Sequence, residues 1–442
     1  MKKTRLKKII LLTVDIGLLY VALLITLLIR YGNLKEWQLH TIPFFWVHIV
    51  WILMFYSAGM YDWERFPPSR RYYVAKLVFT TMIIAGLFAA GLFYFVVYFS
   101  ITPKINLLID TAIVSIFLWI WRVWFLRFSS KGSKIKVLFF GSTEEIKNFA
   151  HFLEHTPSLG YRTETVIDNV RFDHLSLKNF IREKNISLVV VEPSILQNKE
   201  LVRMFYQVLP LGVTIINFPE FYESITGKIP ISVINETWFL ENLVEINKKS
   251  FEIAKRLFDT VCAILLSIPV ILLFPFIALF IKLGSEGPIF YFQDRVGKNG
   301  KVFKFIKFRS MIQNADQFDG IKGSGNDERH TAIGRILRKT YLDELPQIIN
   351  VLRGEMSFVG PRPERPKYVE ILRQQIPFYE IRLLVRPGIT GWAQINMEND
   401  ASVEDAPQKL QHDLYYIKNR SLIMDLAIAL RTASIIIRRE GR

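Results

Sequence analysis

Long apolar runs dominate the first 130 residues of the chain. Each of four runs is long enough to cross a bilayer, because about 20 consecutive apolar residues span its hydrocarbon core. These runs are Ile9 to Ile29, Ile42 to Met60, Ala75 to Phe99 and Ile105 to Phe128. The first run lacks a small-residue cleavage site, which favours a retained anchor over a removed signal peptide. We therefore expect residues 1–130 to form a four-helix transmembrane domain.

After residue 134 the pattern changes to short β-branched runs separated by polar helical stretches, which predicts a small α/β domain. The expected strands are Ile135 to Phe140, Leu188 to Val191 and Val213 to Ile216. Gly141 follows the first strand, in a strand-to-helix turn that could hold a phosphate at a helix N-terminus. However, a dinucleotide-binding turn needs three glycines, and Glu144 and Glu145 would repel a pyrophosphate. We expect residues 134–247 to be a Rossmann-like domain without a cofactor, serving as a spacer, regulator or assembly surface.

A further apolar run, Thr260 to Ile281, contains Ser267, Pro269 and Pro275. Basic residues flank it on both sides, and basic flanks stay in the cytoplasm. They are Lys248, Lys249, Lys255 and Arg256 before the run, and Lys282, Arg295, Lys298, Lys301, Lys304, Lys307 and Arg309 after it. A helix kinked near Ser267 and Pro269 would enter one leaflet and return. We therefore expect a re-entrant membrane helix over residues 257–282, with a fifth ordinary span as the alternative.

Composition and charge narrow the class of protein. Hydrophobic residues make up 51% of the chain and the formal net charge is +16, which favours anionic lipid and phosphorylated substrates over nucleic acid. Basic residues recur in alternate loops of the first domain, so both of its ends are expected in the cytoplasm. The single cysteine, Cys262, excludes an intrachain disulfide framework or a cysteine metal site. The chain is thus expected to be a multi-pass membrane protein.

Adjacent carboxylates follow a basic stretch in the last third of the chain. Arg338 and Lys339 precede Asp343 and Glu344, and Pro346 follows them. Acidic groups among arginines suit phosphate chemistry, because a carboxylate attacks a phosphate only where positive charge reduces the repulsion. The alternative is structural: Asp343 would cap a helix whose first turn holds Pro346, with Glu344 favoured by the helix dipole. These residues alone leave both interpretations open.

Residues 251–442 closely resemble the bacterial sugar transferase family, the monotopic polyprenyl-phosphate phosphoglycosyl transferases. Six ordered motifs carry the resemblance: Lys255-Arg256-Leu257-Phe258-Asp259, Gly287-Pro288-Ile289-Phe290, Lys307-Phe308-Arg309-Ser310-Met311, Leu342-Asp343-Glu344-Leu345-Pro346-Gln347, Gly360-Pro361-Arg362-Pro363-Glu364 and Pro387-Gly388-Ile389-Thr390-Gly391-Trp392. The amino-terminal helices and Rossmann-like domain resemble the large members of the family. The resemblance implies a mostly α catalytic domain with a re-entrant helix broken at a Ser-Pro step. This chain departs from that step by one inserted residue, Ile268.

The resemblance also implies a reaction and roles for individual residues. Asp343 would attack the sugar-side phosphorus of a UDP-sugar, expel UMP and form a phosphosugar-aspartyl intermediate, which undecaprenyl (polyprenyl) phosphate then attacks. Glu344 would orient Asp343, and the two carboxylates would hold Mg²⁺. The expected phosphate and substrate ligands are Arg338, Arg362, Arg309 and Arg386, each with a structural ion pair as its alternative.

The resemblance further implies a bacterial inner-membrane protein with a cytoplasmic catalytic domain and a possible homodimer. Glucose or galactose is the expected sugar, and the product would begin an exopolysaccharide, capsule or O-antigen unit. Every motif lies beyond Asn247, so a fragment starting there is expected to retain activity.

Two other classes of function compete with this interpretation. A membrane nucleotide-sugar dehydratase or epimerase would need a glycine-rich turn and a Tyr-x-x-x-Lys pair, and the sequence has only Tyr72 with Lys76, at a membrane edge. A non-catalytic scaffold for polysaccharide export would leave the arginines around Asp343 without a purpose. Release of UMP distinguishes the transferase from both.

Overall fold

The computed structural model describes residues 2–61, 71–95, 104–130, 134–167, 174–243, 249–312, 329–397 and 404–438. The chain divides into two compact units, Met1–Ser224 and Ile225–Arg442. The expected end of the third apolar run at Phe99 and the expected domain ends at residues 247 and 442 lie outside the described residues.

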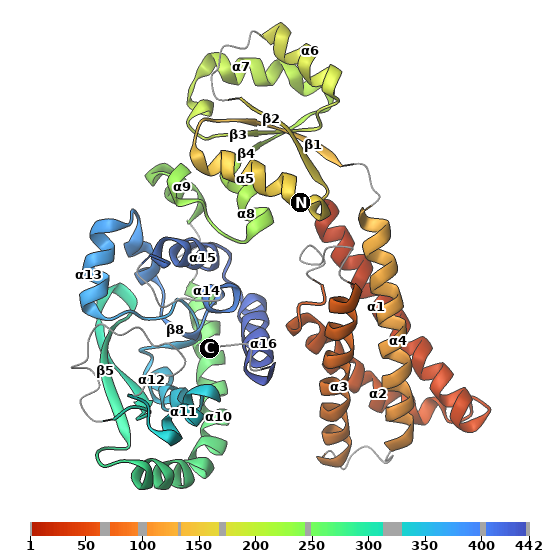
Figure 1. Ribbon diagram of the computed structural model, residues 1–442, viewed down its shortest axis with the longest axis vertical. Coiled ribbons are helices and arrows are strands. Elements are labelled where there is room, and N and C mark those ends of the chain that lie inside the picture. The colour runs from red at the N-terminus through yellow and green to blue at the C-terminus, as the bar shows by residue number, and fades with distance from the viewer. Residues whose placement is uncertain are drawn as a thin grey trace. The chain divides into compact units, whose positions relative to one another are not determined.

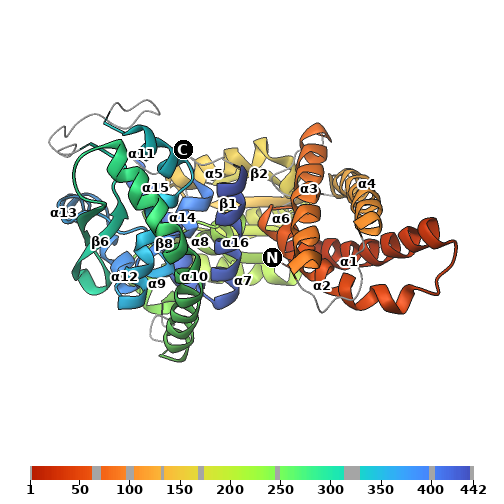
Figure 2. The same ribbon diagram turned by 90° about the horizontal axis from the view of Figure 1, so that it is seen from below.

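Four long apolar helices form the first part of the chain (Figure 1 and Figure 2). They are α1 (Lys2–Tyr31), α2 (Trp37–Ser57), α3 (Arg71–Phe95) and α4 (Lys104–Ser130). Each is long and apolar enough to cross a membrane, as the sequence predicted. Helix α4 packs against α1 and α3, and α2 packs against α3, around a shared core that includes Leu23, Trp51 and Val114. Helix α2 begins earlier than expected, and its extra turn places His40 against Asn106 at 2.9 Å.

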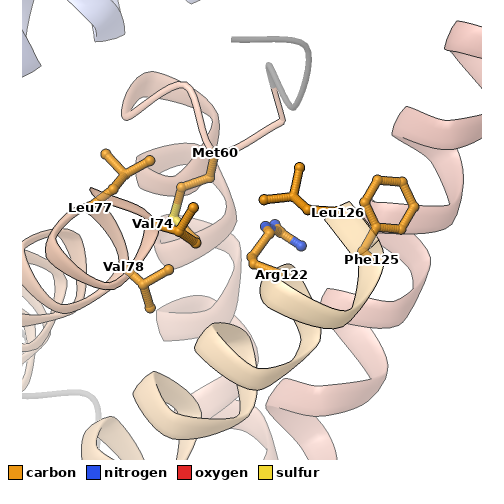
Figure 3. Close-up of a pocket in the computed structure, with 7 residues that line it drawn as sticks. All are labelled: Met60, Val74, Leu77, Val78, Arg122, Phe125 and Leu126. Carbon is orange, nitrogen blue, oxygen red and sulfur yellow. The ribbon is translucent and has the colours of Figure 1, made fainter. Parts of the chain in front are cut away.

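A buried ion pair joins two of these helices. Both guanidinium nitrogens of Arg122 donate to the Asp15 carboxylate, at 3.0 and 2.6 Å. Charged side chains inside a membrane span are costly unless they are paired, so this pair fixes α1 against α4. Arg122 also borders a cavity of about 10 Å³, room for at most one water molecule (Figure 3). Apolar side chains form the rest of its wall: Met60, Val74, Leu77, Val78, Phe125 and Leu126.

The α/β part contains a four-stranded parallel sheet in the order β2-β1-β3-β4. Figure 1 shows α5 and α8 on one face and α6 and α7 on the other. Its elements are β1 (Ile135–Phe140), α5 (Glu144–His155), η2 (Pro157–Leu159), β2 (Tyr161–Ile167), α6 (His174–Lys184), β3 (Leu188–Val191), η3 (Ile195–Gln197), α7 (Lys199–Val208), η4 (Leu209–Leu211), β4 (Thr214–Asn217) and α8 (Phe218–Thr226). Strands β1 and β3 confirm the predicted ranges; β3 is buried throughout and β1 over its last four residues, and such short apolar runs are typical of buried strands.

The second unit is mostly helical, with a β-hairpin and a short parallel strand pair. Its elements are η5 (Ile231–Val233), α9 (Glu236–Asn242), α10 (Lys249–Gly284), β5 (Phe290–Val296), η7 (Lys298–Gly300), β6 (Val302–Phe308), α11 (Ala332–Lys339), η9 (Leu342–Gln347), α12 (Ile348–Arg353), β7 (Ser357–Val359), α13 (Pro366–Gln375), η10 (Tyr379–Leu384), β8 (Gly388–Thr390), α14 (Trp392–Asn396), α15 (Ala406–Asn419) and α16 (Leu422–Arg438).

The segment from residue 225 to 243 belongs to this second unit. Ile229 and Phe239 are buried in the same core as Leu410 and Leu414 of α15. The indole N–H of Trp392 donates to the Gly227 carbonyl at 2.8 Å. The sequence had placed this segment in the α/β domain because its apolar residues do not indicate which core receives them.

Helix α10 is 36 residues long and contains Pro269, at the expected kink, as well as Pro275. Figure 1 shows that it is bent, its second half turning away from the axis of the first. Pro269 and Pro275 explain the bend, since proline removes a helix hydrogen bond and clashes with the preceding turn. The first half buries Ala263 with α12, and the second half buries Ile277 and Ile281 with β6 and α11. Both halves therefore pack on one unit.

Candidate active site

A tight turn presents the adjacent carboxylates. Helix α11 begins at Thr331, whose hydroxyl accepts from the Gly334 N–H at 2.9 Å. A Cβ atom added at Gly334 would lie 1.8 Å from the Ser310 carbonyl oxygen. Helix α11 therefore packs closely against the backbone that follows β6. After α11, Tyr341 adopts a left-handed conformation with φ 57° and starts the short helix η9. Such strain in a non-glycine residue is common beside functional groups.

Asp343 and Glu344 lie within η9, and neither caps a helix. Asp343 is only 6% exposed. One oxygen of Glu344 accepts from two cations, Lys307 Nζ at 2.7 Å and Arg362 Nη2 at 3.0 Å. The geometry therefore does not support the capping role that the sequence left open for Asp343.

The two carboxylates have opposite pKa shifts. Burial raises the pKa of Glu344, but Arg362 and Lys307 outweigh it and hold the pKa well below its usual range. Burial also raises the pKa of Asp343, and here Lys307 offsets only part of the effect while the charge of Glu344 adds to it. Glu344 is thus a fixed anion bound to its cations, whereas Asp343 gains a higher affinity for a proton. Carboxylates in such unlike environments are suited to different roles.

A third cation, Arg338, lies near the adjacent carboxylates Asp343 and Glu344, which together are called the dyad. Its charge acts on Asp343, whose pKa it lowers after the larger effects of burial, Lys307 and Glu344. Its guanidinium contacts the Nε2 atom of His330, and His330 Nδ1 lies 3.3 Å from the Ser310 carbonyl. Arg362 thus contacts the dyad directly through Glu344, whereas Arg338 acts on Asp343 through its charge.

Arg309 and Arg386 have other partners. Arg309 donates to the Ser285 carbonyl at 2.7 Å and to the Glu286 carbonyl at 2.6 Å, which secures the chain after α10. Arg386 lies 3.4 Å from the Glu252 carboxylate and donates to the Gly354 carbonyl. Within the described residues, neither arginine bonds to Asp343 or Glu344.

Lys307 is a site residue that the sequence reasoning missed. It lies on β6 directly opposite Tyr291, and its ammonium lies 5.2 Å from the centre of the Phe305 ring. Phe303, Phe305 and Lys307 alternate along the strand, and the first two are buried. A lysine on the buried face of a strand is the signal that was available, since lysine is seldom buried without a charged partner.

The dyad supplies the number of carboxylates that a magnesium site commonly uses. Mg²⁺ commonly takes one or two protein carboxylates and completes its coordination with water and substrate phosphates. In the described part of the chain, no three His, Cys, Asp or Glu side chains form a ready metal cage. Asp343 and Glu344 supply two carboxylates, although one oxygen of Glu344 already accepts from Lys307 and Arg362. Magnesium here would therefore depend on the diphosphate for further ligands.

Comparison with known proteins matches this site region to one family. Residues 250–439 match the bacterial sugar transferase family. The UDP-N-acetylgalactosamine-undecaprenyl-phosphate N-acetylgalactosaminephosphotransferase of Aeromonas hydrophila is 31% identical over 385 residues, covering 86% of this chain and 83% of the relative. The buried dyad, its cations and this long match define a membrane enzyme of the transferase class, and the chain belongs to the bacterial sugar transferase family.

Other relatives match over a shorter part of the chain. The UDP-glucose:undecaprenyl-phosphate glucose-1-phosphate transferase of Escherichia coli is 44% identical over 181 residues, covering 40% of this chain and 39% of the relative. The exopolysaccharide production protein ExoY of Sinorhizobium fredii is 38% identical over 195 residues, covering 41% of this chain but 84% of the relative. Less than half of this chain thus corresponds to most of that relative.

Proposed function

We propose that the protein transfers a hexose-1-phosphate from a UDP-sugar to undecaprenyl phosphate and releases UMP. The observation that carries this proposal is the buried Asp343 carboxylate beside Glu344 and three cations, within the tract that matches the sugar transferase family. The names of the relatives support the choice of donor and acceptor.

In the first step, a carboxylate oxygen of Asp343 forms a bond to the sugar-side phosphorus, and the bond from that phosphorus to UMP breaks. In the second step, an oxygen of undecaprenyl phosphate attacks the same phosphorus and frees Asp343. Both steps bring anions together, so Arg338, Arg362 and Lys307 lower the barrier by neutralising phosphate charge. Glu344 holds Lys307 and Arg362 in position through its two ion pairs.

Mg²⁺ is part of this proposal. Asp343 and Glu344 are the residues that would hold it, with the diphosphate as a further ligand. Its chemistry there would be to neutralise negative charge on the phosphates.

The proposed membrane arrangement is re-entrant, in a bacterial inner membrane, with the catalytic unit in the cytoplasm. Lys255 near the start of α10 pairs with Asp425 of α16, while Arg309 secures Ser285 just after its end. A straight helix of this length would separate its ends by about 54 Å. Contacts of both ends with one unit support a bent helix. Its outward side chains are apolar, with Leu257 and Ile271 each more than 60% exposed, which suits lipid.

The α/β part is proposed to be Rossmann-like and to act without a dinucleotide. Ligands of such sheets bind beyond the carboxyl ends of the strands where the strand order reverses. Here the Glu192 carboxylate, just after β3, accepts from the Ser142 N–H at 3.1 Å. A Cβ atom added at Gly141 would lie 2.4 Å from Ile146 and 2.6 Å from the same carboxylate, so this glycine makes room for Ile146 and Glu192 rather than for a phosphate.

The test is a panel of UDP-sugars with the full-length protein, Mg²⁺ and undecaprenyl phosphate. UDP-N-acetylgalactosamine, UDP-glucose and UDP-galactose are the first donors, because the relatives differ in their sugars. One donor should yield UMP and a labelled lipid. Absence of UMP from every donor, with folded protein in nanodiscs, would contradict the proposal.

A further inference from the structure

Every backbone carbonyl of the loop that carries Arg362 accepts a hydrogen bond from another segment of the chain. Residues 361–364 contain two prolines, which lack N–H groups and have a restricted φ. All four carbonyl oxygens accept hydrogen bonds: Pro361 from Gly388 N at 3.0 Å, Arg362 from Arg382 Nη2 at 2.8 Å, Pro363 from Arg295 Nη1 at 2.8 Å and Glu364 from Val296 N at 2.9 Å. The backbone beneath the Arg362 side chain therefore has little freedom.

Arg382 is the buried centre of this arrangement. It is 4% exposed and lies in η10. Its Nη2 atom lies 2.9 Å from the Asp413 carboxylate as well as bonding to the Arg362 carbonyl, and its Nη1 donates to the Tyr379 hydroxyl at 2.6 Å. These contacts hold its guanidinium in one orientation.

The same anchorage extends to the acidic end of the loop. The Glu364 carboxylate lies 2.6 Å from Lys409 Nζ, 3.7 Å from Arg295 and 3.9 Å from Arg382. Burial raises the pKa of Glu364, but Lys409 and Arg382 outweigh it and keep the pKa below its usual value. Two groups of the loop are therefore fixed in place: the ionised Glu364 carboxylate at its end and the backbone carbonyl of Arg362.

We propose that Arg382 is a positioning residue for phosphate binding, which fixes Arg362 through its backbone carbonyl without touching the substrate. This inference rests on the proposed function, because Arg362 matters only if its guanidinium binds the diphosphate. Lysine cannot replace Arg382, since one ammonium cannot reproduce the planar fork that reaches Arg362, Asp413 and Tyr379 together.

The test is a double-mutant cycle of Arg382→Lys and Arg362→Lys, measured as kcat and KM for the UDP-sugar in nanodiscs. Arg382→Lys should raise KM and lower kcat/KM by about 10- to 100-fold, because a displaced binding group loses affinity and alignment. In the Arg362→Lys background, the further effect of Arg382→Lys should shrink to about twofold. Residues that act through one group are strongly non-additive.

The matched control is Arg420→Lys. Arg420 also has a buried side chain, and its ion pair is with the Glu252 carboxylate of α10 rather than with the 361–364 loop. Its effect should add to that of Arg362→Lys. If Arg382→Lys lowers kcat through a smaller folded fraction while KM stays unchanged, or if its effect is additive, the positioning role is wrong.

A second variant keeps the test decisive if Arg382→Lys does not fold. Asp413→Asn retains Arg382 but weakens its 2.9 Å ion pair, and it should show the same rise in KM and the same dependence on Arg362. An inactive wild-type protein would contradict the proposed function itself. An active wild type with an additive cycle would contradict only the role of Arg382.

Discussion

Lys307 and Glu344 form a 2.7 Å ion pair that joins strand β6 to the helix carrying the dyad. The same lysine lowers the pKa of Asp343, after the larger opposing effect of burial. Lys307 therefore acts on both carboxylates at once: it fixes Glu344 and helps Asp343 to remain ionised. Because Lys307 affects both carboxylates, replacing it is the most direct test of how the proposed first step depends on pH.

Replacing Lys307 with Met should move the acid limb of the reaction to higher pH. In the proposed mechanism Asp343 attacks as a carboxylate, so the first step should slow as pH falls through its raised pKa. Removing a nearby positive charge raises that pKa further, and protonation then occurs at a higher pH. The measurement is the rate of the UMP burst with UDP-sugar alone, which avoids titration of the polyprenyl phosphate.

Lys307→Arg is the control for this shift, because it keeps the charge while changing the shape. Its acid limb should stay close to that of the wild type even if its rate falls. An acid limb that does not move in Lys307→Met would show that Asp343 ionisation does not control the burst.

Replacing Asp343 and replacing Glu344 with the matching amides should have different effects on the release of UMP. Asp343→Asn should abolish the UMP burst and lower turnover by several orders of magnitude, since an amide is a poor nucleophile towards phosphorus. Glu344→Gln should still give a slow burst, because it weakens the hold on Lys307 and Arg362 but leaves the nucleophile. Rapid-quench measurement of UMP per enzyme separates the cases. If wild type releases UMP only after undecaprenyl phosphate is added, direct transfer replaces the covalent intermediate.

Local patterns predicted local structure well. The four apolar helices and strands β1 and β3 follow from run length and burial, which are properties of adjacent residues. Strand β2 was missed because Arg162, Thr163 and Glu164 interrupt its apolar residues. Strand β4, at the other edge of the same sheet, was predicted because its apolar run is not interrupted in this way.

The missing parts of the site depend on contacts between distant residues. The dyad was visible as a motif, but the pairing of Lys307 with Glu344 spans 37 positions and left no local trace beyond a lysine on a buried strand face. Arg382 was also missed, since nothing in its own neighbourhood indicates that it bonds to the Arg362 carbonyl. The Asp15–Arg122 pair is a similar case within the membrane helices.

A catalytic fragment should begin at Ile225 rather than near Asn247. The later start removes Ile229 and Phe239 from the core of the second unit and leaves Trp392 without its Gly227 partner. Burial of one large apolar side chain contributes about 1.5–3 kcal/mol, so the shorter fragment should be less stable by several kcal/mol. Thermal unfolding of both fragments in the same detergent checks this. Equal melting temperatures would show that the segment contributes no stability.

Activity gives a second comparison of the two fragments. The 225–442 fragment contains all the described contacts of the dyad, so it should keep kcat within a few-fold of the full chain. This tract also makes up most of one relative, since 84% of ExoY aligns with only 41% of this chain. Loss of activity in a folded 225–442 fragment would instead assign a part of the site to the first unit.

Cysteine labelling should place both ends of α10 on the cytoplasmic side. In a Cys262→Ala background, Ser250→Cys lies in the first turn of α10 and Glu286→Cys just after its end, both at exposed positions. Neither should react with an impermeant thiol reagent in intact cells, and both should react after lysis. The physical reason is that Lys255 and Arg309 attach both ends to one unit, while basic flanks resist transfer across the membrane.

Asn33→Cys, in the turn between α1 and α2, provides the matched positive control. Because basic segments stay in the cytoplasm, the start of α1 is expected there, and the turn at its other end should be reactive from outside. If Glu286→Cys reacts in intact cells as Asn33→Cys does, α10 crosses the bilayer. The dyad follows α10 in the sequence, so it would then lie on the outer side, away from cytoplasmic UDP-sugars. Protection of both flanking cysteines, with Asn33→Cys labelled, is the pattern that a bent helix with cytoplasmic chemistry requires.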